Sequence, residues 1–200
     1  EDTTCFSIVD RWGNAVCILQ SLQTAFGSSL IAKDTGILLN NRMTYWHLDP
    51  DHLDCLEPGK RVRHTMNPVM AFKDRPDGGR DLTLVFGTPG ADTQVQTNFQ
   101  VLTHVLDYGM NVAEAVEAPR WRHVQDGTES AIPHTAKDEL RLEERFDPGV
   151  IEDLKRRGHP VSVIGNWSAT GSETMIQLDP VEGTLSGAAD PRRDGYAIGY

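Results

Sequence analysis

Two adjacent threonines, Thr3 and Thr4, stand almost at the start of the chain. A Thr whose own α-amino group is free combines a nucleophile and a base in one residue. Its hydroxyl attacks a carbonyl carbon, while the amine, with a pKa of about 8, accepts the proton. That chemistry needs Thr at the first position of a chain, whereas Glu1 and Asp2 precede Thr3. Two β-branched residues also favour the start of a β-strand, so position alone leaves a strand as the simpler interpretation.

Composition argues against some classes of partner. The 200 residues include 29 acidic and 19 basic side chains, for a net charge of −10, whereas a nucleic-acid site needs a basic face. No apolar run reaches the roughly 18 residues of a membrane-spanning helix. No secretion leader is present, which says little if the chain is the downstream half of a precursor. A chain of this length can bury a core as a single domain without disulfides.

The cysteine and histidine spacings predict neither a disulfide framework nor a metal site. Cys5, Cys17 and Cys55 are odd in number and form no C-x-x-C motif, and the seven histidines form no H-x-H or H-x-x-x-H pair. Cys5 and Cys17 lie in apolar runs, so we expect them to be buried small hydrophobic residues. Unpaired cysteines favour a reducing, cytoplasmic compartment, although a periplasmic or secreted protein stays open. We expect no cofactor.

The element that would position Thr3 is a β-hairpin. Residues 6–9 and 15–19 have the composition of strands, and the polar turn between them contains Gly13, which can adopt a positive φ. Further strands are expected at 36–39, 69–73, 82–86, 160–164, 174–178 and 184–188.

Helices are expected in the second half of the chain. Val95, Phe99, Leu102 and Leu106 recur at steps of four, three and four, which predicts one apolar helical face after the turn at 87–91. Shorter helices are expected at 112–117 and 148–157, and a polar loop at 47–63. Strands and helices in this order favour an α+β fold over a βαβ repeat.

Six motifs in one order resemble the small catalytic subunit of γ-glutamyltransferase-like N-terminal-nucleophile hydrolases. The resemblance implies a four-layer αββα sandwich and a precursor that cuts itself between Asp2 and Thr3. It implies that residues 1–200 form a single catalytic-subunit domain. A larger N-terminal subunit from the same precursor would be its partner and would supply an Arg for the substrate carboxylate. The motifs are Thr3-Thr4-x-Phe6-Ser7, Ser21-Leu22-Gln23-x-x-Phe26-Gly27-Ser28, Gly36-Ile37-Leu38-Leu39-Asn40-Asn41, Pro89-Gly90, Asp107-Tyr108-Gly109-Met110-Asn111 and Gly187-Ala188-Ala189-Asp190-Pro191-Arg192.

The resemblance also implies roles for individual residues. Thr3 would be the nucleophile, and Ser21 would place a hydroxyl beside it. Gln23 matches a position that contacts the polar head of the substrate. Gly90 and Ala91 match a Gly-Gly oxyanion hole, in which two backbone N–H groups face the developing charge. Ala in place of Gly is tolerable there if its φ is negative.

The substrate pocket departs from the pattern of the transferases. Tyr45 stands where an acidic residue is expected to hold the substrate's ammonium group, and Arg42 stands where a neutral or acidic residue is usual. Because Arg42 would repel an ammonium group, a carboxylate or an uncharged acyl group is favoured. His64 and Thr65 replace two serines that contact the α-carboxylate. These features resemble the oxamate-amidohydrolase and acylase-like branch, with a small-molecule amide as substrate.

Three functions stay open. The first is an amide hydrolase or acyltransferase that works through an acyl-enzyme ester on Thr3, with little cleavage of glutathione. The second is a true γ-glutamyltransferase whose ammonium contact comes from Glu57 or the large subunit. The third is a non-catalytic homologue that serves as a binding subunit. The presence of Glu1 and Asp2 ahead of Thr3 favours this alternative.

Overall fold

The computed structural model describes residues 2–126 and 135–200, so Glu1 lies outside the described residues. The chain begins with the expected hairpin, in which strand β1 (Asp2–Val9) pairs antiparallel with β2 (Ala15–Gln23). Asp10 Oδ1 accepts hydrogen bonds from the backbone N–H groups of Trp12 and Asn14, both at 2.9 Å. Gly13 adopts a φ of +83° in the same turn, so the turn chemistry predicted from the sequence is confirmed.

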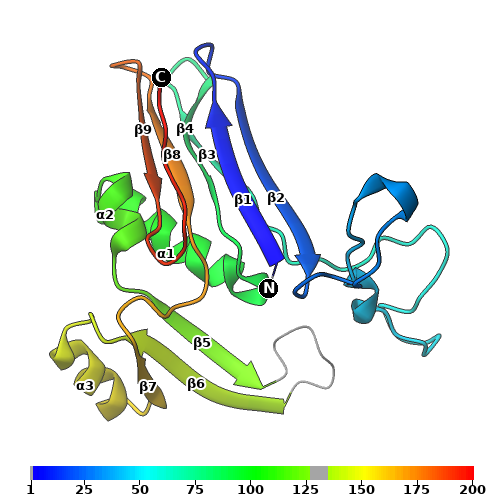
Figure 1. Ribbon diagram of the computed structural model, residues 1–200. Coiled ribbons are helices and arrows are strands. Elements are labelled where there is room, and N and C mark those ends of the chain that lie inside the picture. Colours follow the sequence, from blue (N-terminus) through cyan, green and yellow to red (C-terminus); the bar gives the residue numbers. More distant parts are fainter. Residues whose placement is uncertain (1, 127–134) are drawn as a thin grey trace.

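The hairpin packs against a four-stranded antiparallel sheet with the order β3-β4-β8-β9. Its strands are β3 (Val69–Asp74), β4 (Arg80–Gly87), β8 (Thr174–Asp179) and β9 (Thr184–Ala189). Helices α1 (Gln94–Leu106) and α2 (Val112–Glu117) lie on the opposite side of this sheet (Figure 1). Helices, sheet and hairpin are three successive layers of the expected α+β sandwich.

Side chains alternate between the two faces of β4, because successive residues of a strand point to opposite sides. Leu84 and Phe86 are at most 1% exposed and pack with Val101, Val116 and other residues of the helices in the main core. On the hairpin side, a Cβ on Gly87 would lie 2.9 Å from Cys5 Sγ and 3.1 Å from Cys17 Sγ. Glycine therefore lets the two thiols approach the sheet.

A second, three-stranded sheet lies below the first in Figure 1 and has the order β5-β6-β7. It consists of β5 (Trp121–Asp126), β6 (Thr135–Glu143) and β7 (Val161–Ile164), and α3 (Pro148–Arg156) connects the parallel pair β6 and β7. Asp147 caps α3 by accepting a hydrogen bond from Gly149 N, and the helix lies where the sequence predicted one. The sequence did not predict β5 and β6.

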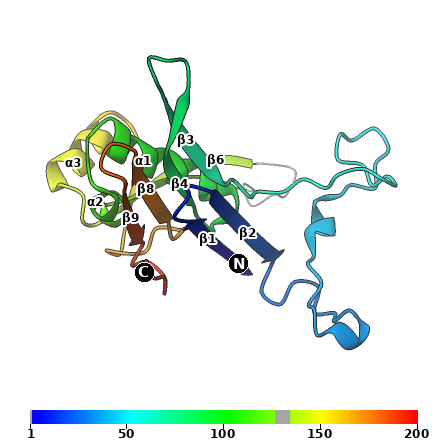
Figure 2. The same ribbon diagram turned by 90° about the horizontal axis from the view of Figure 1, so that it is seen from above.

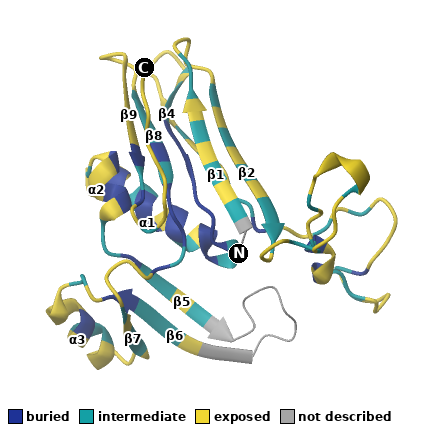
Figure 3. Ribbon diagram, in the orientation of Figure 1, coloured by how far each residue is buried: buried dark blue, intermediate teal, exposed yellow. Residues whose placement is uncertain are grey.

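Residues 24–68, here called the arm, connect β2 to β3 and project away from the sheets (Figure 2). The arm is largely exposed (Figure 3) and contains two short 3-10 helices, η1 (Lys33–Thr35) and η2 (Arg42–Tyr45). The strand expected at 36–39 was wrong. Only an isolated bridge joins Ile31 to Leu38, and Ile37 is 61% exposed, because no described strand lies beside this segment to pair with it.

Helix α1 forms as predicted, but the face expected to be buried is not. Val95 and Phe99 are 60% and 58% exposed, whereas Gln94 and Gln100 are 1% and 4% exposed. The buried amides bond to neighbouring backbone, since Gln100 exchanges two hydrogen bonds of 3.0 Å with the backbone of Trp121. Polar side chains thus take the inward face by binding connecting segments. No described helix is long and apolar enough to span a membrane.

Candidate active site

Thr3 and Ser21 meet at one end of the hairpin. They are paired across β1 and β2, and their hydroxyl oxygens lie 2.9 Å apart. Thr3 is half-buried, while the neighbouring Thr4 points to the opposite face of the strand and is exposed. The register of the hairpin therefore brings one threonine, and not the other, to Ser21.

Arg42 reaches the same hydroxyl from η2 in the arm. Its Nη2 donates to Ser21 Oγ at 2.8 Å, and its Nη1 donates to Tyr45 Oη at 2.9 Å and to Thr65 Oγ1 at 3.4 Å. Arg42, Tyr45 and Thr65 are 8%, 6% and 6% exposed. Segments 18 to 62 residues beyond Thr3 in sequence thus converge in one buried hydrogen-bonded cluster.

The charge of Arg42 is not balanced by any described residue. No carboxylate among the described side chains, those of residues 3–124 and 138–200, forms an ion pair with it, and its Nε has no hydrogen-bond partner there. The neighbouring Arg63, whose Cζ lies 5.5 Å from the centre of the Tyr45 ring, pairs instead with Asp92 at 3.1 Å. A buried cation without a counter-ion is costly, so the cluster favours an anion and disfavours an ammonium group.

Gln23 and His64 differ in their distance from this cluster. The backbone N–H of Gln23 donates to Ser21 Oγ at 3.0 Å, and its side chain bonds to Thr44 Oγ1 at 3.0 Å. Its φ of +80° marks a strained backbone at the end of β2. His64 is exposed, and its Nδ1 accepts a hydrogen bond from Met66 N at 3.2 Å. His64 therefore stands outside the cluster that joins Thr3, Ser21 and Arg42.

Gly90 and Ala91 form the turn between β4 and α1. Gly90 has a φ of +139°, and Thr93 Oγ1 donates to its carbonyl oxygen at 2.6 Å. Neither backbone N–H of the pair donates a hydrogen bond within the described chain, so both can face a developing oxyanion. The condition of negative φ at Ala91 is not met, because its φ is +48°. A non-glycine residue in this left-handed region costs about 1 kcal/mol. Contacts of the surrounding turn must offset that cost and hold the backbone in this conformation.

An open cavity of about 550 Å³ lies beside Thr3. Sequence reasoning did not identify the segment after β9 as part of this wall. Neither Arg42 nor Tyr45 lines the cavity, whereas Thr3 does, and the Thr3 hydroxyl also contacts Ser21 of the arginine cluster. The lining residues are Thr3, Thr4, Cys5, Pro89, Ser172, Thr174, Pro191, Arg192, Arg193, Asp194 and Gly195.

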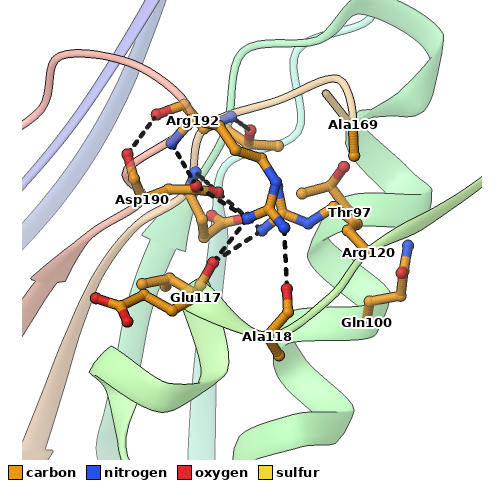
Figure 4. Close-up of polar contacts among 12 residues, drawn as sticks. Thr97, Gln100, Glu117, Ala118, Arg120, Ala169, Asp190 and Arg192 are labelled. Atoms are coloured by element: carbon orange, nitrogen blue, oxygen red, sulfur yellow. Dashed lines mark hydrogen bonds and ion pairs between the residues drawn. The ribbon is translucent and has the colours of Figure 1, made fainter. Parts of the chain in front are cut away.

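A buried ion network holds the segment after β9 in place. Arg192 pairs with Glu143 at 2.6 Å and with Asp190 at 3.0 Å, and Arg120 pairs with Asp190 at 2.8 Å. All four side chains are at most 2% exposed. Arg192 also donates to the carbonyl oxygen of Ala118 at 2.9 Å (Figure 4). The only signal of this network in the sequence was the motif at residues 187–192, since the ion-pair partners lie up to 70 residues apart and Ala118 lies 74 residues from Arg192.

Three titratable groups near the hairpin, Glu173, Cys5 and Cys17, have shifted pKa values. Burial raises the pKa of Glu173 from 4.5 to about 8, with the charge of Asp190 adding to the rise and that of Arg120 opposing it. A hydrogen bond to Cys17, together with burial, raises the pKa of Cys5. Glu173 and Cys5 are therefore neutral near pH 7, whereas the same hydrogen bond lowers the pKa of Cys17 to about 6. The described residues contain no group of three His, Cys, Asp or Glu side chains placed to hold a metal ion.

Comparisons of the sequence and of the fold with known proteins identify the same protein family. The family model described as Gamma-glutamyltranspeptidase matches residues 1–200. The chain is 41% identical over 199 residues to the Glutathione hydrolase-like YwrD proenzyme of Bacillus subtilis, covering 99% of this chain and 36% of that protein. It is 39% identical over 200 residues to the Oxamate amidohydrolase proenzyme of Klebsiella pneumoniae, covering 100% and 36%. The chain thus spans about a third of the length of these relatives.

Solved structures of gamma-glutamyltranspeptidases match the fold of this chain. Gamma-glutamyltranspeptidase from Pseudomonas nitroreducens complexed with L-DON matches with a TM-score of 0.76 and 30% identity, over 98% of this chain and 99% of that chain. The expected α+β fold of N-terminal-nucleophile hydrolases is confirmed. The chain belongs to the gamma-glutamyltranspeptidase family.

Proposed function

We propose that this chain is the catalytic part of an enzyme that cleaves amide bonds, with Thr3 as nucleophile. The observation that carries the proposal is the part-buried chain of hydrogen bonds from Thr3 to Ser21 to Arg42. The two oxygens lie 2.9 Å apart, and Ser21 Oγ lies 2.8 Å from Arg42 Nη2. Scission between Asp2 and Thr3 would free the α-amino group that serves as base. The names of the relatives, which include the word proenzyme, support such a cut and a larger upstream subunit as partner.

The reaction would run in two halves. Thr3 Oγ1 attacks the amide carbon while its proton passes to the α-amino group, and the N–H groups of Gly90 and Ala91 stabilise the oxyanion. The α-ammonium then protonates the leaving nitrogen, the carbon–nitrogen bond breaks, and an ester on Thr3 remains. Water, or an acceptor amine, attacks that ester after losing its proton to the same α-amine, which releases the acid or a new amide.

Arg42 supports an acyl group that carries a carboxylate. Its buried guanidinium lacks a described counter-ion, so a substrate anion beside it would relieve the cost of burial. Oxamate, the substrate in the name of the Klebsiella relative, is the first compound to test. A γ-glutamyl amide is disfavoured because its ammonium group would meet Arg42. Glu57, the alternative ammonium contact, is 59% exposed and paired with Lys60 at 3.6 Å.

Steady-state hydrolysis by the full-length protein tests the proposal. We expect kcat/KM for oxamate to exceed that for acetamide, which has no carboxylate, and for γ-glutamyl-p-nitroanilide by about tenfold or more. Thr3→Ala should abolish turnover, whereas Thr184→Ala is the matched control and should keep it, because Thr184 is an exposed strand threonine on β9 that does not line the cavity.

Two results would contradict this function. A preference for γ-glutamyl-p-nitroanilide would indicate a true γ-glutamyltransferase. A single uncut chain by intact mass, without turnover, would indicate a non-catalytic binding subunit.

A further inference from the structure

We infer that Arg42 is a positioning residue that acts through Ser21 and fixes the direction of the hydrogen bond at the nucleophile. The inference rests on the proposed function, in which Thr3 is the nucleophile. It assigns Arg42 a role in the chemical step, in addition to any contact with the acyl group of a substrate.

The direction follows from the donors and acceptors around Ser21. A hydroxyl has one proton to donate and two lone pairs that accept, whereas guanidinium and backbone N–H groups can only donate. Ser21 Oγ accepts from Arg42 Nη2 at 2.8 Å and from Gln23 N at 3.0 Å. Both lone pairs are then occupied, so the proton of Ser21 has only Thr3 Oγ1, at 2.9 Å, as its acceptor.

This direction suits nucleophilic attack. Because Thr3 Oγ1 accepts from Ser21, the proton of Thr3 itself is turned away from Ser21 and is available to its own α-amino group. As attack begins, negative charge grows on Thr3 Oγ1, and the hydrogen bond from Ser21 becomes charge-assisted and stronger. The cation of Arg42, one hydrogen bond further back, polarises the Ser21 hydroxyl in the same sense.

The position of the cation has a second consequence. The separations of 2.8 and 2.9 Å keep the charge of Arg42 close to the residue that carries the α-amino base. A nearby positive charge disfavours protonation of that amine and lowers its pKa. Arg42 would therefore keep the base neutral, and the enzyme active, at a lower pH than an uncharged residue in its place.

The hydrogen bond from Cys5 lowers the pKa of Cys17 to about 6, and this thiol is present in every variant tested below. The other charges near the hairpin end are neutral, paired or screened. Glu173 is neutral at pH 7 because burial raises its pKa to about 8, and Arg192 is paired in the buried ion network. Arg193 and Asp194 are exposed, so solvent screens them. Among the described side chains, the charged and titratable groups considered are Arg42 and Tyr45 on η2, Arg63 with its partner Asp92, Cys5 on β1, Cys17 on β2, Glu173 before β8, and Arg192, Arg193 and Asp194 after β9.

A neutral probe separates this role from substrate binding. Phenylmethanesulfonyl fluoride has no carboxylate for Arg42 to hold, and its reaction with Thr3 forms a sulfonate ester with loss of fluoride and a proton. The rate of modification is followed by intact mass of the chain that starts at Thr3, from pH 5 to pH 9. The plateau rate reports the nucleophile, and the acid limb reports its base.

Two substitutions at Arg42 give opposite expectations. Arg42→Lys keeps a cation that can only donate, so the plateau rate should stay within about threefold of wild type. Arg42→Gln offers both a donor and an acceptor and removes the charge, so the plateau should fall about tenfold and the acid limb should move up by about one pH unit. Arg63→Gln is the matched control, because Arg63 lies at the same Tyr45 ring but pairs with Asp92. It should change neither quantity.

A double mutant tests whether Arg42 acts through Ser21. Ser21→Ala alone should slow the plateau about a hundredfold, and adding Arg42→Gln to it should slow the plateau further by less than about twofold, because residues that act as one unit are not additive. A tenfold further loss would overturn the inference, as would equal plateau rates and acid limbs for Arg42→Gln and wild type. A Lys variant as slow as the Gln variant, at an unchanged melting temperature, would overturn it too. If wild type is not modified on Thr3, the proposed function falls as well.

Discussion

Replacement of Glu173 by Gln is expected to stabilise the protein at alkaline pH. Glu173 is fully buried, and neither of its carboxylate oxygens has a hydrogen-bond partner among the described residues. Its ionised form is therefore poorly supported, which is why burial raises its pKa from 4.5 to about 8. Gln has nearly the same shape and cannot ionise, so the substitution isolates the effect of the charge.

The size of the effect follows from proton linkage. Between pH 4.5 and about 8, Glu173 keeps its proton in the native protein but loses it in the unfolded chain. The unfolded chain binds fewer protons there, so the free energy of unfolding falls as the pH rises. One pH unit corresponds to about 1.4 kcal/mol, so this residue removes up to about 5 kcal/mol of stability across the window and nothing further above it.

Urea unfolding at pH 5, 6, 7 and 8 measures this dependence. Glu173→Gln should match wild type within about 1 kcal/mol at pH 5 and exceed it by several kcal/mol at pH 8. Glu182→Gln is the control, because Glu182 is exposed in the turn after β8, and its difference from wild type should stay near zero throughout. A difference for Glu173→Gln that does not grow between pH 5 and pH 8 would refute the reasoning.

Three further substitutions have expected outcomes. Ala91→Gly should raise the free energy of unfolding by about 0.5 to 1 kcal/mol, because Gly adopts a φ of +48° without strain; a loss of stability would contradict the strain. Gly87→Ala should cost about 1 to 3 kcal/mol in urea, because the added Cβ would lie 2.9 Å from Cys5 Sγ, and Cys5→Ala should restore part of the loss. Asp190→Asn should cost about 3 to 5 kcal/mol, since it leaves two buried arginines undercompensated; a change below 1 kcal/mol would show that the network does not hold the fold.

The hairpin was within reach of the sequence. The predicted strands, 6–9 and 15–19, stop short of Thr3 and Ser21, and only the family resemblance placed the Ser21 hydroxyl beside Thr3, as the pairing of β1 and β2 has it. The types of residue at positions 42 and 45 also indicated a change of charge in the pocket. The hydrogen bond from Arg42 to Ser21 was not predictable, because the two residues lie 21 positions apart in sequence and only tertiary structure places η2 at the hairpin end.

The missed elements share a physical reason. Local sequence patterns predict that charged and amide side chains are exposed. Glu143 at the end of β6 is nevertheless fully buried, because it pairs with Arg192, 49 positions away. In α1 the same rule predicted that the apolar face is buried. Instead, Gln94 and Gln100 are buried, and their amides bond to backbone groups of other segments. Partners that decide burial lay too far along the chain to be read from local periodicity.

The most direct measurement is the identity of the residue that carries the acyl group in the active protein. The full-length protein is incubated with an amide substrate, quenched in acid, and its fragments are identified by intact mass and peptide sequencing. We expect a fragment whose first residue is Thr3, with the acyl group as an ester on that residue. An active fragment that still begins with Glu1 and Asp2, or an acyl group on any other residue, would contradict an N-terminal threonine nucleophile.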